Sequence, residues 1–371
     1  MRMPAFDAVL LLSFGGPERS EDVMPFLRRV TAGRGIPDDR LTAVAAQYEA
    51  FGGQSPINDQ NKELVRLLEA TLNSGVERDD PRFLPVYWGN RNWDPLLPDT
   101  LRQMRADGIG RAAVVFTSGY SSYSGCRQYR ENLYDAVAEL AADGQGAPPE
   151  LAKIRRWFDQ PAFIDVMTDN VLSAIDSLND PDPTAITIAF TTHSIPTAQS
   201  ELTGDPELGG DMYVRQHEFV ARTIAANVAQ SLGHAVAWDL VFQSRSGPPR
   251  VPWLEPDISD HIDSVAAAGA RAVVVVPIGF MSDHMEVMWD LDTVARDRAL
   301  EQGLAFARAA TVGTDPRFVS ALAELVRERE ADLPEEQRVA LAPWGPAPDS
   351  CPANCCATSS TPRPALCGQD S

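Results

Sequence analysis

A histidine placed directly after a predicted strand is the first residue suited to catalysis. His193 stands within Thr192–Pro196 (THSIP), just beyond the apolar run Ala185–Thr191. An imidazole titrates close to neutral pH, so it can act as a general base or bind a metal ion. A histidine that only forms a hydrogen bond in a turn, or caps the next helix, would occupy the same place. The local sequence leaves both interpretations open.

A second group of polar side chains follows the apolar run Ala272–Ile278. It contains His284, Glu286 and Asp290. If a helix starts near Ser282, Glu286 and Asp290 lie one turn apart on one face. Two carboxylates beside an imidazole offer hard ligands to a divalent cation. Acidic residues also favour the first turn of a helix for electrostatic reasons alone, but Glu286 and Asp290 lie too far into this predicted helix for that to explain both.

The cysteines form a third group, and most of them lie in the tail. Cys126 is in the body of the chain, whereas Cys351, Cys355, Cys356 and Cys367 fall within the last 21 residues. An odd number of cysteines without a secretion signal does not suggest a disulfide framework. The tail fits an iron–sulfur cluster, which needs four thiolates, a zinc site, or free thiols. Zinc favours paired CxxC hooks, and the tail has none.

The overall composition is that of a soluble globular protein, with 44% hydrophobic and 23% charged residues. A net charge of −20 argues against binding nucleic acid or an anionic membrane. The longest apolar run is too short to cross a bilayer, and Gly15, Gly16 and Pro17 make the opening segment a better strand than a signal peptide. We therefore expect a cytoplasmic monomer without a nucleic-acid partner or an integral membrane segment.

Apolar runs with the character of strands alternate with amphipathic stretches along the chain. This alternation predicts an α/β fold with open, mostly parallel sheets covered by helices. A break at Asp143–Pro149 predicts an N-terminal lobe at 1–147, a C-terminal lobe at 148–335 and a Cys-rich tail at 336–371, which cannot build a core of its own. The expected strands are Ala8–Phe14, Phe83–Trp88, Ala112–Thr117, Ala185–Thr191, Leu240–Gln243 and Ala272–Ile278, and the expected helices are Asn61–Leu72, Leu133–Leu140, Phe163–Leu178, Val214–Leu232 and Pro316–Glu330.

Polar or glycine-bearing loops directly follow the predicted strands. In open α/β sheets, ligands bind beyond the carboxyl ends of the strands, so these loops predict a single large cleft. No GxGxxG follows a strand and no GxxxxGK[ST] occurs, which leaves dinucleotide and P-loop sites without support.

Six segments between Ser13 and Asp292 resemble successive motifs of ferrochelatases, in the order of that family: SFGGPE, YEAFGGQSPIN, YWGNRNWDP, THSIP, QSRSGPPRVPWLEPD and GFMSDHMEVMWDLD. The resemblance is to the iron–sulfur type found in actinobacteria. It implies a chelatase-like fold, with two Rossmann-like lobes and parallel sheets around a porphyrin cleft. It also implies a lyase-type enzyme of haem biosynthesis, which inserts Fe²⁺ into coproporphyrin III and releases two protons.

Three alternatives stand beside this function. The porphyrin could be protoporphyrin IX, or the enzyme could be a cobalt chelatase acting on another tetrapyrrole. A non-catalytic α/β binding protein of the periplasmic type is the third, and both the missing signal peptide and the His193/Glu286 pair argue against it.

The resemblance assigns roles to individual residues of the cleft. His193 and Glu286 become the catalytic pair that flanks the metal-insertion point, with Asp290 and His284 as further metal ligands. Relatives from Gram-positive rods that use coproporphyrin carry a tyrosine where this chain has Phe14, so we expect no axial phenol ligand. Val294 shortens the acidic face beyond Asp290. The residues expected to bind the porphyrin are Phe14, Arg34, Ser55, Tyr123 and Tyr129.

The resemblance also assigns the cysteines. Cys126 corresponds to the internal ligand of a [2Fe–2S] cluster, and the tail supplies the other three from Cys351, Cys355, Cys356 and Cys367. Five cysteines for four places leave one spare, which the sequence does not identify.

Overall fold

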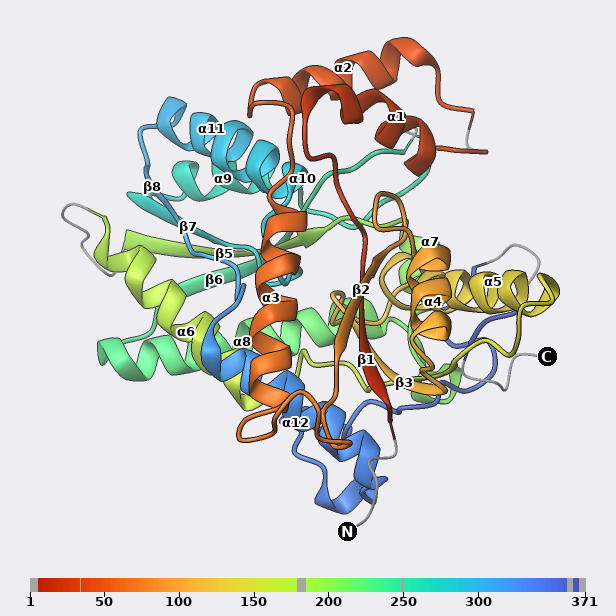
Figure 1. Cartoon of the computed structure of the whole chain (residues 1–371). Coiled ribbons are helices and arrows are strands. Elements are labelled where there is room, and N and C mark those ends of the chain that lie inside the picture. The colour runs from red at the N-terminus through yellow and green to blue at the C-terminus, as the bar shows by residue number, and fades with distance from the viewer. Residues whose placement is uncertain (1–5, 34, 179–184, 248–249, 359–362, 367–371) are drawn as a thin grey trace.

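The computed structural model describes residues 6–33, 35–178, 185–247, 250–358 and 363–366 (Figure 1). It contains two four-stranded sheets, ordered β2-β1-β3-β4 and β6-β5-β7-β8, and every strand pair is parallel. The predicted α/β fold with two parallel-sheet lobes is therefore confirmed.

The first sheet consists of β1 (Ala8–Ser13), β2 (Val86–Asn90), β3 (Arg111–Phe116) and β4 (Glu150–Lys153). Strand β1 is buried along its whole length because helices cover both faces of the sheet. Alternate residues point to opposite faces. Leu11 packs toward α3 (Ile57–Leu72), whereas Leu10 packs toward α4 (Leu97–Ala106) and α5 (Gln128–Ala142).

The second sheet repeats this arrangement with β5 (Ile186–His193), β6 (Ala237–Gln243), β7 (Ala272–Val276) and β8 (Ala305–Arg308). Phe190 of β5 packs in one core with α6 (Pro161–Asp176) and α8 (Met212–Leu232). Its neighbour Ala189 packs on the opposite face with α9 (Ile258–Ala267), the π-helical turn η4 (Asp290–Ala295) and α11 (Arg296–Glu301). Strand β5 is thus central and places its last residue at the carboxyl edge of the sheet.

The two lobes share one hydrophobic core. Helix α12 (Pro316–Ala331) contacts α3 of the first lobe and α6 of the second, and Phe318 of α12 packs against Trp157 and Phe163. Strand β4 belongs to the first sheet, since it pairs with β3. The first sheet consequently extends past residue 147, where the break in the sequence placed the lobe boundary.

Helices α1 (Ser20–Val30) and α2 (Asp38–Glu49) lie together beyond the carboxyl edge of β1, at the top of Figure 1. The remaining short elements are the helices α7 (Thr197–Ser200) and α10 (Met285–Trp289), the π-helical turn η1 (Tyr123–Arg127), and the 3₁₀ turns η3 (Pro206–Leu208) and η5 (Glu335–Gln337). Among the helices of the described ranges, none combines the length and the apolar character needed to span a membrane.

Candidate active site

His193 is the last residue of β5, and its imidazole is about one-third exposed. Nδ1 forms a hydrogen bond with the carbonyl oxygen of Ser194. A carbonyl only accepts, so Nδ1 carries a proton, and in the neutral imidazole Nε2 then has the lone pair. Nε2 lies 3.7 Å from Oε2 of Glu286. The structure therefore brings together the two residues that the sequence predicts as the catalytic pair.

Glu286 lies in the first turn of α10, which begins at Met285 rather than near Ser282 as predicted. The residues before it form an irregular loop that ends at His284, whose extended backbone precedes the helix. Sequence analysis placed Glu286 too far into the helix to interact with the positive end of the helix dipole. That expectation is wrong, because Glu286 lies in the first turn. Its side chain is 56% exposed, so it remains open to a metal ion or a substrate.

Asp290 lies one turn beyond Glu286, at the start of η4. The pKa of Asp290 is raised to about 6: burial is the largest cause and the charge of Glu286 adds to it, while a hydrogen bond donated by the Ser244 hydroxyl opposes both. His284 packs edge-on against Phe280, with ring centroids 4.9 Å apart. Burial lowers the pKa of His284, so its imidazole stays neutral near pH 7. All four predicted metal-site residues therefore lie on β5 or in the segment that follows β7.

A partly buried arginine fixes the loop that carries His284. Arg308, at the end of β8, forms ion pairs with Asp283 (3.1 Å) and with Asp292 of η4 (2.5 Å). Gln60 of α3 accepts a hydrogen bond from the backbone N–H of Asp283 (3.2 Å), which ties the loop to the first lobe as well. Sequence analysis missed Arg308 and Gln60, because no local spacing links them to the loop.

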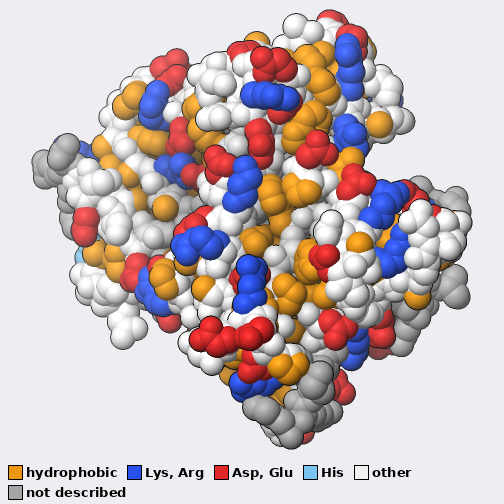
Figure 2. All heavy atoms as spheres, viewed as in Figure 1, with side chains coloured by type: hydrophobic (Ala, Val, Ile, Leu, Met, Phe, Trp, Pro, Cys, Tyr) orange, Lys and Arg blue, Asp and Glu red, His pale blue; other side chains and the backbone are white. Residues whose placement is uncertain are grey.

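The first lobe contributes an aromatic wall on the other side. The Phe26 ring of α1 makes edge-on contacts with Phe14, Tyr48 and Trp93, at centroid distances of 6.1 to 6.3 Å. Met285 packs into the same cluster and so joins α10 to α1 and α2. Burial raises the pKa of Tyr48, and the Glu286 carboxylate raises it further. Figure 2 shows the surface indented between α1–α2 and α4–α5, with hydrophobic side chains at the inner end.

The predicted porphyrin-binding residues occupy several places in the first lobe. Phe14 follows β1, and the guanidinium of Arg91 lies 5.6 Å from its ring centroid. Ser55 is buried against Gly16, where a Cβ atom would come within 2.8 Å of it. The Tyr123 hydroxyl donates to Glu131 (3.0 Å).

Tyr129 is 4% exposed and packs against Phe116 in the core of the first lobe, at a centroid distance of 5.1 Å. Its ring also lies beneath Arg91, whose guanidinium carbon is 4.5 Å from the centroid. Tyr129 therefore turns its ring toward the core and toward Arg91. Arg34 lies outside the described residues.

Four cysteines converge at a second site, between η1 and the tail. Cys126, Cys351, Cys355 and Cys356 are each at most 2% exposed, form one buried cluster, and are not in disulfides. The sulfurs of Cys355 and Cys356 lie 3.8 Å apart. Cys367 lies outside the described residues. In the described part of the chain, no three His, Cys, Asp or Glu side chains surround a common point as ligands of a single metal ion.

The cysteine site is electropositive on its inner side. Arg156 directs Nη1 toward the sulfur of Cys126 (3.5 Å), and the backbone N–H of Gly204 points at the sulfur of Cys356 (3.2 Å). Hydrogen bonds from Cys126 and Cys355, the charge of Arg156 and the Gly204 N–H lower the pKa of Cys356 well below its usual range. The site therefore favours at least one thiolate.

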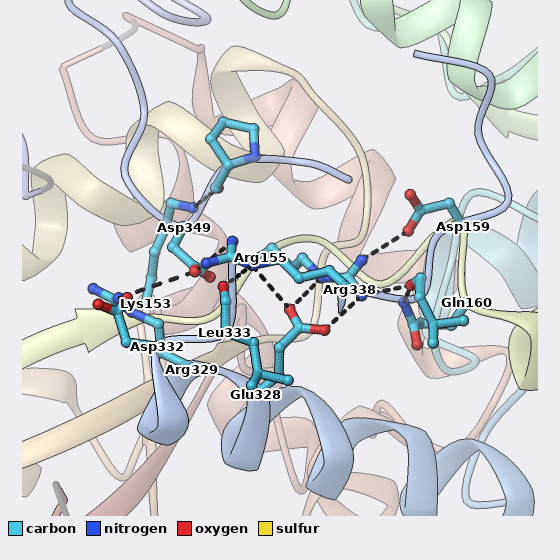
Figure 3. Close-up of polar contacts among 12 residues, drawn as sticks. Lys153, Arg155, Asp159, Gln160, Glu328, Arg329, Asp332, Leu333, Arg338 and Asp349 are labelled. Carbon is cyan, nitrogen blue, oxygen red and sulfur yellow. Dashed lines mark hydrogen bonds and ion pairs between the residues drawn. The ribbon is translucent and has the colours of Figure 1, made fainter. Parts of the chain in front are cut away.

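A network of buried charges anchors the tail to the body (Figure 3). Arg155 makes a bidentate pair with Glu328 of α12, at 2.6 and 3.0 Å, and also donates to the Val339 carbonyl. Lys153 donates to the carbonyl of Pro348 (2.8 Å). These contacts hold the tail at the end of β4, next to the four cysteines, and so supply the order that its own composition cannot.

The chain is similar to known proteins at the level of family, full-length sequence and structure. The family model described as Ferrochelatase matches residues 6–330. Two curated relatives are named coproporphyrin III ferrochelatase. The one from Streptomyces griseus is 50% identical over 376 residues, covering 100% of this chain and 98% of the relative, and the one from Streptomyces coelicolor is 51% identical over 371 residues, covering 99% and 97%. Among solved structures, SirB from Bacillus subtilis with Fe³⁺ matches 90% of this chain and 99% of its own, with a TM-score of 0.47 and 12% identity.

Proposed function

The chain belongs to the ferrochelatase family, and we propose that it inserts Fe²⁺ into coproporphyrin III in haem biosynthesis. Full-length relatives at 50% and 51% identity that carry this name support the choice of porphyrin. The observation that carries the proposal is the pairing of Nε2 of His193 with Oε2 of Glu286, 3.7 Å apart at the carboxyl edge of the second sheet. Cleft ligands of open α/β sheets bind at this edge.

The chemistry of the substrate defines what the site must do. A free-base porphyrin is planar and carries two inward N–H protons, so its nitrogen lone pairs do not face an incoming ion. Insertion requires bending the ring, removing both protons and stripping water from Fe²⁺. A cleft complementary to the bent ring favours the transition state over the flat substrate.

We assign the removal of the pyrrole protons to His193. Because Nδ1 donates to the Ser194 carbonyl, Nε2 is the nitrogen with the lone pair in the neutral ring, and this lone pair can accept a pyrrole proton beside Glu286. The Tyr213 hydroxyl donates to the carbonyl of His193 (2.8 Å) and so fixes the end of β5. The imidazole thus faces the substrate from a rigid strand.

We assign the handling of the metal and the exit of protons to Glu286, Asp290 and His284. Glu286 is the most accessible of them and offers a carboxylate to Fe²⁺. Asp290, with a pKa raised to about 6, exchanges protons readily near neutral pH. Neutral His284 adds an imidazole beside them.

The porphyrin itself would lie against the aromatic wall of the first lobe. Phe14 lies in that wall, and Phe cannot supply an axial phenol ligand to the iron. We assign to Ser55, Tyr123 and Arg34 the contacts with the macrocycle edge and its carboxylates. Tyr129, whose ring lies in the core beneath Arg91, would support that guanidinium rather than touch the macrocycle.

We further propose that Cys126, Cys351, Cys355 and Cys356 hold a [2Fe–2S] cluster. Four buried free thiols are the donor set this cluster needs. The thiolates are divided between two irons, so no three of them need to surround one ion. When bound, the cluster supplies a one-electron couple and a covalent tie between the tail and η1. Cys367 is then the spare cysteine.

The compartment and the oligomeric state are proposals as well. Reduced, buried thiols fit the cytoplasm, where disulfides are rare. A monomer is sufficient, because one chain supplies the catalytic pair, the aromatic wall and all four cysteines.

An anaerobic competition assay tests the function. The purified full chain is given Fe²⁺ or Co²⁺ with coproporphyrin III or protoporphyrin IX, and the Soret band is followed. We expect the highest kcat/KM for Fe²⁺ with coproporphyrin III. A preference for protoporphyrin IX would mean that this porphyrin, and not coproporphyrin III, is the substrate. Insertion of Co²⁺ alone would mean that the enzyme is a cobalt chelatase.

A further inference from the structure

A buried arginine beside the cysteine site, Arg156, forms no ion pair with a carboxylate of the described residues. The buried Asp159 is near enough for Arg156 to lower its pKa, but its ion pair is with Arg155. Arg156 is 8% exposed, and its Nε lacks a hydrogen-bond partner. Within the described ranges, no carboxylate forms an ion pair with it, although Arg155, its neighbour in sequence, is paired with Glu328. A buried guanidinium without an anion carries a large desolvation cost. A negative charge close to Arg156 would therefore stabilise the guanidinium in this position.

The groups that face Arg156 are the four cysteines. Nη1 points at the sulfur of Cys126, 3.5 Å away, and the sulfurs of Cys351, Cys355 and Cys356 also act electrostatically on the guanidinium. Neutral thiols would not compensate its charge, whereas metal-bound thiolates would. Two other buried cations near the tail donate to carbonyl oxygens, Arg130 to Cys355 (2.9 Å) and Lys153 to Pro348 (2.8 Å), and Arg155 pairs with the Glu328 carboxylate. Arg156 is thus distinguished by its contact with sulfur.

We propose that Arg156 is the counter-ion of the cysteine-bound cluster and raises its reduction potential, an inference that rests on the [2Fe–2S] cluster proposed above. Reduction adds one electron, and hence one negative charge, to a group that four thiolates already make anionic. A fixed positive charge within hydrogen-bonding distance of one sulfur stabilises the reduced form more than the oxidised form. Arg156 is a positioning and tuning residue here, remote from the His193 site.

The test compares Arg156→Met with a matched control, Lys153→Met. Both variants remove one buried cation from the same segment, but Lys153 contacts a carbonyl oxygen and Arg156 contacts sulfur. Iron and sulfide content and the visible spectrum are measured first, after anaerobic purification of the full chain. The midpoint potential then follows from a dithionite titration with mediator dyes, in which dithionite supplies the electron. Arg156→Lys keeps the charge and serves as the conservative variant.

We expect Arg156→Met to bind a full cluster whose ratio of reduced to oxidised form, at a fixed potential, falls by about tenfold or more. Arg156→Lys should recover most of the loss, and Lys153→Met should shift the ratio much less. If Arg156→Met loses the cluster while Arg156→Lys retains it, the result would also support the inference, because it would show that the cluster needs a positive charge at this position. An unchanged potential in a loaded Arg156→Met, or loss of the cluster in both Arg156 variants, would overturn the inference. A wild type without iron would instead overturn the cluster proposal itself, and this inference with it.

Discussion

Nε2 of His193 and Oε2 of Glu286 lie 3.7 Å apart, although β5 and α10 deliver the two residues from separate parts of the second lobe. The proton on Nδ1 is held by the Ser194 carbonyl, so the nitrogen that faces the carboxylate is the basic one. Fe²⁺ would therefore meet a bent porphyrin beside this base and this carboxylate, which lie too close together for the ring to pass between them. The predictions below follow from this arrangement and from the cysteine site.

His193→Ala should lose most of the metal-insertion activity while still binding porphyrin. A positioned general base is worth ~10²–10⁴-fold in rate, whereas the aromatic wall that would hold the ring is untouched. Insertion is followed by the Soret band and porphyrin binding by fluorescence quenching. His234→Ala, just past the C-terminal end of α8, is the control and should be active. Near-normal turnover in His193→Ala would contradict the assignment.

Asp290→Asn should lower the metal-insertion rate less than His193→Ala does, and it should change the pH dependence of kcat. Burial raises the pKa of Asp290 to about 6, so the wild-type carboxyl is neutral below that pH and attracts Fe²⁺ only above it. The wild-type rate should therefore rise with pH through about 6, and the variant should lack this rise. Asp297→Asn, on the exposed side of α11, provides the comparison. The same inflection in both variants would remove Asp290 from the mechanism.

Protein purified without oxygen should be reddish-brown, with visible absorption that dithionite bleaches and about two irons per chain. Cys126→Ser should be colourless because it removes a ligand from the buried set. Cys367→Ser should keep its colour, since the other four cysteines suffice. Zinc-loaded or metal-free wild type, or a colourless Cys367→Ser, would show that the ligand set is different.

Arg155→Met should destabilise the protein by about 3–5 kcal/mol, because it leaves Glu328 and Asp159 buried without their shared cation. Arg317→Met removes a comparable but half-exposed arginine, which pairs with Asp169, and should cost at most about 1 kcal/mol. Urea unfolding measures both. Equal losses in the two variants would mean that the network of Figure 3 does not anchor the tail.

The sequence predicts the central strands well and the edge strands poorly. Strands β1, β5 and β7 are buried on both faces and therefore read as continuous apolar runs. Strands β4 and β8 have four residues each and include charged ones, so no pattern reveals them. The start of α10 was predicted too early. The ion pairs of Arg308 with Asp283 and Asp292 shape the loop before α10, and Arg308 belongs to β8, which is distant in sequence.

The functional residues divide in the same way. His193 and Glu286 stand in distinctive local motifs, and the resemblance to ferrochelatases carried by those motifs predicts them as a pair. The convergence of Cys126 with the tail follows from composition and resemblance, but Arg156 carries no local signal. Its significance depends on its contacts: within the described residues no carboxylate forms an ion pair with it, and its Nη1 points at a cysteine sulfur. Only a three-dimensional structure reveals that.

A double-mutant cycle tests most directly whether His193 and Glu286 act as one unit. Single-turnover rates of Fe²⁺ insertion into coproporphyrin III are measured for the wild type, His193→Ala, Glu286→Gln and the double variant. Residues that serve one step are strongly non-additive, so the double variant should be scarcely slower than the slower single variant, with each single loss ~10²-fold or more. Near-wild-type rates in either single variant, or a double loss equal to the product of the two, would contradict the shared site.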